Sequence, residues 1–318
     1  MTSKADSASS DRRRQVPSLE ASSLRLGEKA IGAFLALCAA ISVVVTSAIV
    51  ISLMVPTVDF FRHVSLGEFF GSTIWAPSFA NPSFGVWPIV VGSAMVVTIS
   101  LFISVPVGLL SAVYLSEYAP DRVRRTIKPA IEVVAGVPTV AIGLFAFWFL
   151  RPLAEKVFPF LPWRGPFSTL IAGVAVGLLT VPIITSVSDD AMRAVPVALR
   201  EGAFALGANK MKVSLRVIFP AAISGIVASI VLAGSRAVGE TMVVLLAAGA
   251  GNPRLSFNPL GGVQTMTAFI AGKATGDIPT GTVVYDTIFA VGALLFVSTL
   301  VLNMISMRLV RRFREAYE

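Results

Sequence analysis

Two opposite charges, Arg236 and Glu240, lie four residues apart in a segment, 217–251, that carries no other charged residue. On an α-helix this spacing places both side chains on one face, where they can form an ion pair. A charged side chain at membrane depth costs several kcal/mol, so it normally faces a bundle interior or a water-lined cavity and marks a solute pathway. Arginine also presents a planar fork of donors that matches a tetrahedral oxyanion. The pair therefore predicts an anion pathway, and the alternative is an ion pair that only joins helices.

The rest of the chain must supply a bundle around these charges, and its composition favours one embedded in a membrane. Charged residues make up 14% of the 318 residues, against about 25% in typical soluble domains. Hydrophobic residues make up 55%, and the mean hydropathy is +0.81. This composition excludes a soluble globular protein. The single cysteine excludes an internal disulfide framework and the single histidine excludes sites built on paired imidazoles, so we expect neither a metal nor a cofactor.

Six apolar segments are long enough to cross a bilayer core, which takes about 20 helical residues. They are 30–55, 88–115, 133–150, 167–188, 217–251 and 287–307. We therefore predict an all-α membrane protein with six transmembrane helices. With the N-terminus inside, the inner segments hold 19 Lys and Arg residues and the outer loops hold six. Positive charges favour the inner side, so both termini are expected in the cytoplasm.

The first outer loop, 56–87, is rich in phenylalanine and contains two of the four tryptophans. All four tryptophans fall in or beside segments predicted to be outer, where amphipathic rings favour the membrane interface. The loop is therefore predicted to form an interfacial helix on the outer leaflet. A docking surface for an external partner is the alternative.

The longest inner connection, 189–216, is predicted to be structured. Ser188, Asp189 and Asp190 are residue types that cap helix N-termini, Pro196 suits a first helical turn, and Gly207 suits a left-handed stop. These signals predict a short helix over 197–206, with Arg200 and Glu201 on its polar face. Such a helix is too short to be stable alone. Either the protein's own bundle or a cytosolic partner is expected to cover it.

The chain has no nucleotide-binding signature. The Gly-x-x-x-x-Gly-Lys-Ser/Thr phosphate loop is absent, as are the Gly-x-Ser-x-Gly and His-Glu-x-x-His motifs. A membrane enzyme would need an acid, base or metal cluster, and Glu132, Asp189 and Asp190 are the inner candidates. We therefore expect a transport subunit rather than an enzyme, with any ATP hydrolysis performed by another polypeptide. An ion-coupled secondary transporter or channel for another oxyanion remains the alternative.

Two segments resemble a known family. Residues 200–208, REGAFALGA, and 217–226, VIFPAAISGI, resemble the EAA loop of permease subunits in ABC importers. Gly202 stands where the general consensus has alanine, as in permeases for phosphate and related oxyanions. Residues 236–242, RAVGETM, resemble the permeases of Pst phosphate importers, and Met242 after Thr241 indicates the C-type subunit, PstC. The resemblance covers about 88–307.

The resemblance implies a type-I ABC importer permease fold in the cytoplasmic membrane and assigns roles to named residues. Arg236 and Glu240 would take the positions of the charged pair associated with phosphate translocation. The coupling loop, which docks on the ATP-binding subunit, would contain Arg200, Glu201, Gly202, Ala203 and Gly207.

The resemblance also implies a set of partners and a division of the chain. The partners would be a second permease similar to PstA, two ATP-binding subunits similar to PstB and an external phosphate-binding protein similar to PstS, with no nucleic acid. The expected parts are a disordered cytoplasmic tail, a first transmembrane helix with its outer interfacial loop, the type-1 permease core, and a basic cytoplasmic tail. Their bounds are 1–28, 29–87, 88–307 and 308–318.

Overall fold

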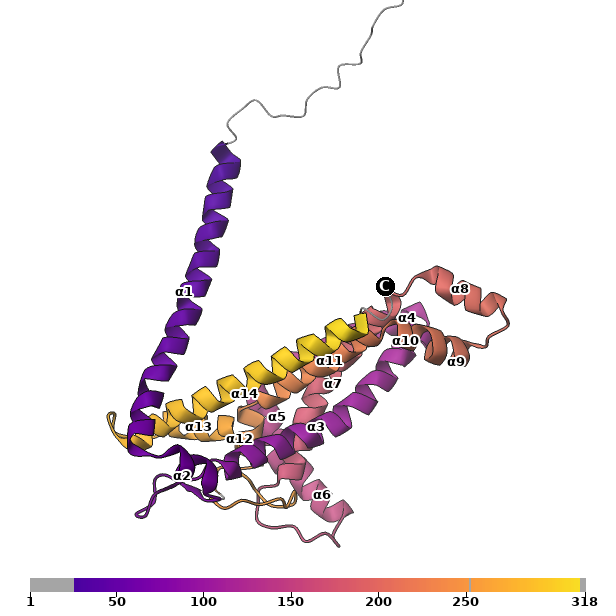
Figure 1. The fold of residues 1–318 in the computed structure, drawn as a ribbon. Helices are drawn as coiled ribbons and strands as arrows, with labels where there is room; N and C mark the ends of the chain where they lie inside the picture. The colour runs from indigo at the N-terminus through magenta and orange to yellow at the C-terminus, as the bar shows by residue number, and fades with distance from the viewer. Residues whose placement is uncertain (1–25, 252, 315–318) are drawn as a thin grey trace, which may run out of the picture. The chain divides into compact units, whose positions relative to one another are not determined.

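The computed structural model describes residues 26–251 and 253–314, and most of this part of the chain is helical (Figure 1). The chain divides into two compact units, Met1–Ile51 and Ser52–Glu318. Most of the tail expected over 1–28 lies outside the described residues.

The helices and strands, in chain order, are as follows. They are α1 (Leu26–His63), α2 (Leu66–Gly71), β1 (Trp75–Ala76), β2 (Ser83–Phe84), α3 (Trp87–Val113), the π-helix η1 (Tyr114–Tyr118), α4 (Asp121–Ala135), α5 (Thr139–Phe145), η2 (Ala146–Leu150), α6 (Arg151–Val157), α7 (Thr169–Arg193), α8 (Val197–Ala205), α9 (Lys210–Val213), η3 (Ser214–Ile218), α10 (Phe219–Ala221), α11 (Ile223–Val238), α12 (Met242–Ala247), α13 (Met266–Ala274) and α14 (Val283–Arg314).

By length and apolar composition, the described residues contain four helices that can each cross a membrane. These are α1, α3 with η1, α7 and α14. Two further candidates are bent pairs, Asp121–Ala135 with Thr139–Val157 at 89° and Lys210–Ala221 with Ile223–Val238 at 71°. Counting each bent pair as one span gives six, which is the number expected from the apolar segments.

The third expected span, 133–150, is wrong at its start. Helix α4 ends at Ala135, and a new helical stretch begins only at Thr139. Pro138 explains the break, because a proline disfavours helical backbone at the residue before it. The apolar stretch therefore starts after the break, and α4 is a separate amphipathic helix before it, with arginines on one side and apolar residues on the other.

Helices α3 and α7 pack closely together and form the centre of the second unit. Glycines make the approach possible: a Cβ atom added to Gly173 would lie 2.6 Å from Cβ of Ile99, and one added to Gly108 would lie 2.7 Å from Cβ of Ile184. Both distances are too short for real carbon atoms, so each position requires glycine. Helix α11 packs against α7, α3 and α14, and α14 runs beside it (Figure 1).

The expectation of a single interfacial helix over 56–87 is wrong. This segment contains the end of α1, the short helix α2 and the antiparallel pair β1–β2. Phe60, Phe69 and Trp75 are buried in one apolar cluster with Phe269 of α13. Their rings meet edge to face, with centroids 5.0–6.2 Å apart, an arrangement that stabilises aromatic pairs beyond their buried area. Part of the aromatic content of this loop therefore builds a core that includes Trp75, whereas Phe70, Phe79 and Trp87 are exposed.

Candidate functional site

Arg236 and Glu240 do not share a helix, which corrects the expectation of a pair stacked on one helical face. Helix α11 ends at Val238, with Gly239 as its C-cap. Arg236 is exposed in the last turn of α11, whereas Glu240 is buried after the break. Among residues 26–251 and 253–314, no ion pair joins Arg236 to Glu240.

Each of the two charges instead lies at a helix end of the opposite polarity. The C-terminus of a helix carries a partial negative charge, which favours the guanidinium of Arg236. Oε1 of Glu240 accepts a hydrogen bond from the backbone N–H of Val243, 3.3 Å away, at the start of α12, where the partial charge is positive. The carbonyl of Glu240 also accepts a hydrogen bond from Oγ1 of Thr267 in α13 at 2.7 Å. Glu240 therefore stabilises the backbone at the helix break, whereas the side chain of Arg236 is exposed and does not pair with Glu240.

The capping roles expected for Ser188, Asp189 and Asp190 are wrong. All three lie inside α7, which continues to Arg193. The hydroxyl of Ser188 is hydrogen-bonded to that of Ser229 on α11, at 2.8 Å. The apolar segment ends at 188, but the helix continues because ion pairs hold its last turn.

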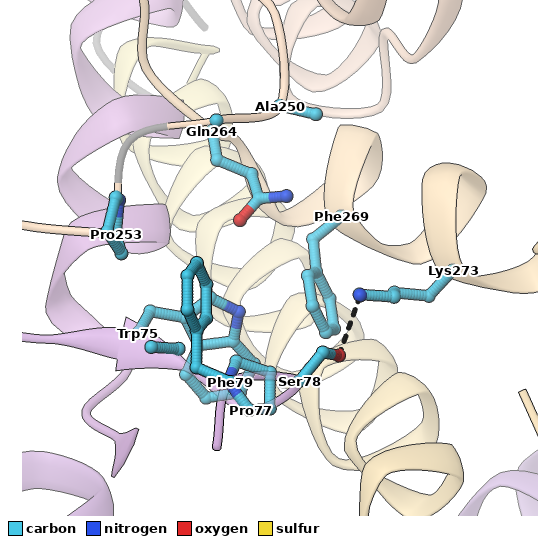
Figure 2. A pocket seen from close by; sticks show the side chains of 11 residues that line it. Trp75, Pro77, Ser78, Phe79, Ala250, Pro253, Gln264, Phe269 and Lys273 are labelled. Atoms are coloured by element: carbon cyan, nitrogen blue, oxygen red, sulfur yellow. Dashed lines mark hydrogen bonds between the residues drawn. The ribbon is translucent and has the colours of Figure 1, made fainter. Parts of the chain in front are cut away.

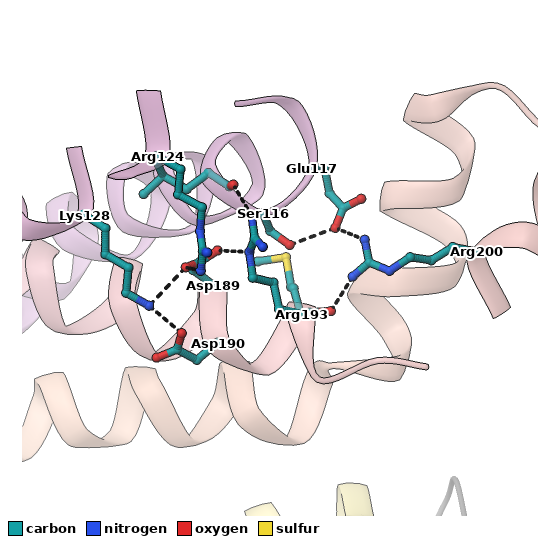
Figure 3. A network of polar contacts seen from close by, with 10 residues as sticks. Ser116, Glu117, Arg124, Lys128, Asp189, Asp190, Arg193 and Arg200 are labelled. Carbon is teal, nitrogen blue, oxygen red and sulfur yellow. Dashed lines mark hydrogen bonds and ion pairs between the residues drawn. The ribbon is translucent and has the colours of Figure 1, made fainter. Parts of the chain in front are cut away.

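Asp189 is the centre of that ion-pair network, and none of its surface is exposed (Figure 3). Its Oδ2 lies 2.8 Å from Nη2 of Arg124 and 3.3 Å from Nζ of Lys128, both on α4. Its Oδ1 lies 3.3 Å from Nε of Arg193, one turn later on α7. Lys128 also pairs with the exposed Asp190. A buried carboxylate with three cations around it fixes α4 to the end of α7, since removing a partner from a buried pair is costly.

The predicted inner helix is present as α8, Val197–Ala205, and Gly207 after it has a φ of +77°. This confirms the helix and its left-handed stop, although Pro196 precedes the first turn instead of lying in it. The five residues expected in the coupling loop do not share one environment. Glu201, Gly202 and Gly207 are exposed, whereas Arg200 and Ala203 are partly buried.

Arg200 faces the protein's own bundle. Its Nη1 lies 2.7 Å from Oε1 of Glu117 in η1, and its Nη2 donates to the carbonyl of Met192 in α7 at 2.7 Å (Figure 3). No sequence pattern marks Glu117, Arg124 or Lys128 as a partner in these ion pairs. Glu117 lies two residues after the apolar segment 88–115, but its partner follows 83 residues later, so spacing alone does not reveal the pair.

A small hollow lies between two segments, 56–87 and 252–281, that follow the first and fifth expected spans and are therefore predicted to be outer loops (Figure 2). Its volume is about 110 Å³, and Trp75, Phe79, Gln264 and Phe269 are among its lining residues. Lys273 of α13 spans the two segments, because its Nζ donates to Oγ of Ser78 at 2.7 Å. The two expected outer loops therefore form one surface.

Residues 104–316 match the family described as "Binding-protein-dependent transport system inner membrane component". The "Probable ABC transporter permease protein YqgH" of Bacillus subtilis is 33% identical over 264 residues, which cover 82% of this chain and 83% of that protein. The "Phosphate transport system permease protein PstC 1" of Mycobacterium tuberculosis is 31% identical over 266 residues, which cover 77% of this chain and 79% of that protein.

Solved ABC importers have a similar fold. A chain of a bacterial alginate ABC transporter, crystallised with an alginate-bound periplasmic protein, superposes with a TM-score of 0.61 at 15% identity, covering 91% of this chain and 98% of that one. A chain of the MetNI methionine ABC transporter gives 0.54 at 19% identity, covering 72% and 97%. The fold, the apolar helices and the sequence matches together show that the chain belongs to the family of binding-protein-dependent transport system inner membrane components, the multi-pass permease subunits of ABC importers.

Proposed function

We propose that this permease forms, with a second permease, the path by which an ATP-driven importer carries inorganic phosphate across the cytoplasmic membrane. One observation carries the proposal. Arg236 projects an exposed guanidinium from the end of α11, and no residue in the described ranges forms an ion pair with it. The sequence similarity to a phosphate transport permease of M. tuberculosis supports phosphate as the anion that Arg236 would attract.

Arg236 lowers the barrier for an anion because a guanidinium offers paired donors that match a tetrahedral oxyanion. Glu240 does not neutralise it between transport events. The partial negative charge at the C-terminus of α11 stabilises the guanidinium of Arg236. Glu240 holds the backbone that follows α11 in place through its hydrogen bonds with Val243 and Thr267. A single arginine per permease attracts phosphate without holding it so tightly that release becomes slow.

The partner subunits are assigned to the two ends of the bundle. A phosphate-loaded external protein, similar to PstS, docks on the surface formed by segments 56–87 and 252–281. The exposed side of α8, which includes Glu201 and Phe204, docks on an ATP-binding subunit similar to PstB. Closure of two such subunits moves α8 and favours one orientation of the path, since each state is populated according to its differential interactions.

Uptake in a strain that lacks its own phosphate permease tests this function. The strain should express this chain with the partner subunits, and labelled phosphate, sulfate and molybdate should be supplied separately. We expect ATP-dependent uptake of phosphate, with little uptake of the other two anions. Preferred uptake of sulfate or molybdate would contradict the assignment of phosphate. Uptake that continues without ATP and stops when the ion gradient collapses would favour a secondary transporter.

A further inference from the structure

We propose that Arg200 is a positioning residue that docks the coupling helix α8 onto the protein's own bundle, with Glu117 as its partner. Its importance for transport rests on the proposed function, whereas the docking itself does not. Arg200 lies within the segment expected to contact the ATP-binding subunit. Its contacts assign it to the opposite side of that helix.

The guanidinium of Arg200 joins two different elements. One nitrogen binds the carboxylate of Glu117 in η1, and the other binds the carbonyl of Met192 in α7, both at 2.7 Å. The side chain of Arg200 is 19% exposed and that of Glu117 is 7% exposed. Oε1 of Glu117 also accepts a hydrogen bond from Oγ of Ser116, 2.8 Å away. Charge-assisted hydrogen bonds that are shielded from water in this way are stronger than neutral ones.

Apart from Arg200, α8 is held by its packing against η3 and α9, and that packing is shallow. The helix has nine residues, none of them buried, and a helix of that length is marginal without tertiary contacts. Ala203 is partly buried against an apolar cluster that contains Met192. Phe204 and Leu206 are 48% and 90% exposed, so they contribute little to docking. Arg200 is therefore the main polar contact between α8 and the bundle.

The contacts continue from Arg200 into three helices. Glu117 belongs to η1, which continues α3 without a break. Met192 is followed on α7 by Arg193, whose Nη2 donates to the carbonyl of Leu115 at 3.4 Å and whose Nε pairs with Asp189. Asp189 in turn holds α4. A displacement of α8 is thereby transmitted to the ends of α3, α4 and α7 together, provided that Arg200 remains bound.

Lysine cannot fully replace arginine in this role. A guanidinium donates from separate nitrogens in a rigid fork, whereas an ammonium is a single compact charge. Arg200→Lys should keep the pairing with Glu117 and weaken the contact with the Met192 carbonyl. The conservative variant is therefore expected to dock α8 less firmly than the native residue and more firmly than alanine.

Thiol labelling of the full-length chain in membranes measures docking directly. The chain has one cysteine, so Cys38→Ser gives a background free of thiols. In that background, Ala203→Cys places a probe on the partly buried side of α8, and Ala198→Cys places a matched probe on its exposed side. The rate of maleimide labelling at Ala203→Cys reports how often α8 leaves the bundle.

We expect Arg200→Ala, which removes the contacts with both Glu117 and the Met192 carbonyl, to raise the labelling rate at Ala203→Cys by about tenfold or more. Glu117→Ala should raise the rate less, because the contact of Arg200 with the Met192 carbonyl remains, and Arg200→Lys should also have a smaller effect. The double variant should match Arg200→Ala, because without Arg200 the carboxylate of Glu117 has no docking contact left to lose. Labelling at Ala198→Cys should stay unchanged throughout. Equal rates at Ala203→Cys with and without Arg200 would overturn the proposal.

The assembled transporter supplies the second readout. Arg200→Ala and Glu117→Ala should both keep the ATP-binding subunit during purification and both transport less phosphate per ATP hydrolysed, with part of the loss restored in Arg200→Lys. Loss of the ATP-binding subunit from Arg200→Ala alone, with normal labelling, would show that Arg200 contacts that subunit and would overturn the proposal. If the native complex transports no phosphate while labelling changes as expected, the proposed function fails and the docking role stands.

Discussion

Helix α11 ends between Arg236 and Glu240, so the guanidinium is exposed in its last turn while the carboxylate is buried beside the N–H of Val243. Arg236 and Glu240 therefore have different roles. Glu240 stabilises the backbone at the start of α12, and Arg236 is exposed, as its proposed role toward an anion requires.

Substitution of Glu240 tests the structural half of this division. Glu240→Ala removes both the acceptor for the Val243 N–H and the charge at the start of α12, and should lower the free energy of unfolding by about 1–2 kcal/mol. Glu240→Gln keeps an acceptor and should cost about 0.3–1 kcal/mol, the value of a charge at a helix end. Thermal unfolding of the purified complex compares the two. Equal stability of the native protein and Glu240→Ala would contradict this role.

Substitution of Asp189 should destabilise the protein far more than substitution of its neighbour Asp190. Asp189→Asn leaves three cations without their buried counter-charge and should destabilise the protein by about 3–5 kcal/mol. The Asp190 side chain is 63% exposed, and exposed pairs contribute about 0–1 kcal/mol. The yield and the unfolding temperature of the two asparagine variants, measured side by side, check the difference. Similar losses from both would show that the network is not centred on Asp189.

Gly173 should not accept a larger residue. A Cβ at this position would lie 2.6 Å from Cβ of Ile99, so Gly173→Ala forces α3 and α7 apart and should cost about 1–3 kcal/mol. Gly272, on the exposed side of α13, has no atom within 4 Å of the corresponding position. Gly272→Ala should be neutral or stabilising by up to about 1 kcal/mol. Unfolding temperatures of both variants provide the test, and an unchanged value for Gly173→Ala would refute the close packing.

The exposed apolar residues of the α8 region should bind the ATP-binding subunit. Phe204→Ser combined with Leu206→Ser removes two side chains that the bundle leaves uncovered, and should weaken association by about tenfold or more, as expected for central interface residues. Insertion into the membrane should be unaffected. Phe257→Ser, at a residue that is 70% exposed in a predicted outer loop, is the matched control and should retain the subunit. The amount of ATP-binding subunit that co-purifies with each variant is the measurement, and equal amounts with both variants would contradict this role for Phe204 and Leu206.

The sequence predicted the number of spans, because apolar length alone defines them, but not where the backbone bends. Pro138 is the signal for the break after α4, but a proline is uncharged, so a span defined by its lack of charged residues continues through it. The helix α8 was predicted well, since Gly207 and the preceding residues mark its limits locally. The positions of Arg236 and Glu240 were found by charge, whereas their separation depends on the end of α11 at Val238, which spacing does not show.

Ion pairs between segments that are far apart along the chain leave no signal in the sequence. Asp189 looked like a helix cap because it follows an apolar segment, and only the fold brings Arg124 and Lys128 to it. The same is true of Glu117 and Arg200. Such pairs depend on how helices cross, and single residue types carry no information about that.

Arg236 is proposed to lie on the route of phosphate, so uptake of labelled phosphate should depend on the side chain at this position. Arg236→Gln removes the charge and should abolish uptake, while Arg236→Lys keeps a charge without the fork of donors and should reduce it. Both variants should still co-purify with the ATP-binding subunit, because Arg236 lies in the last turn of α11, at the end of that helix away from its connection to α8. Full uptake by Arg236→Gln would show that phosphate crosses without the guanidinium of Arg236.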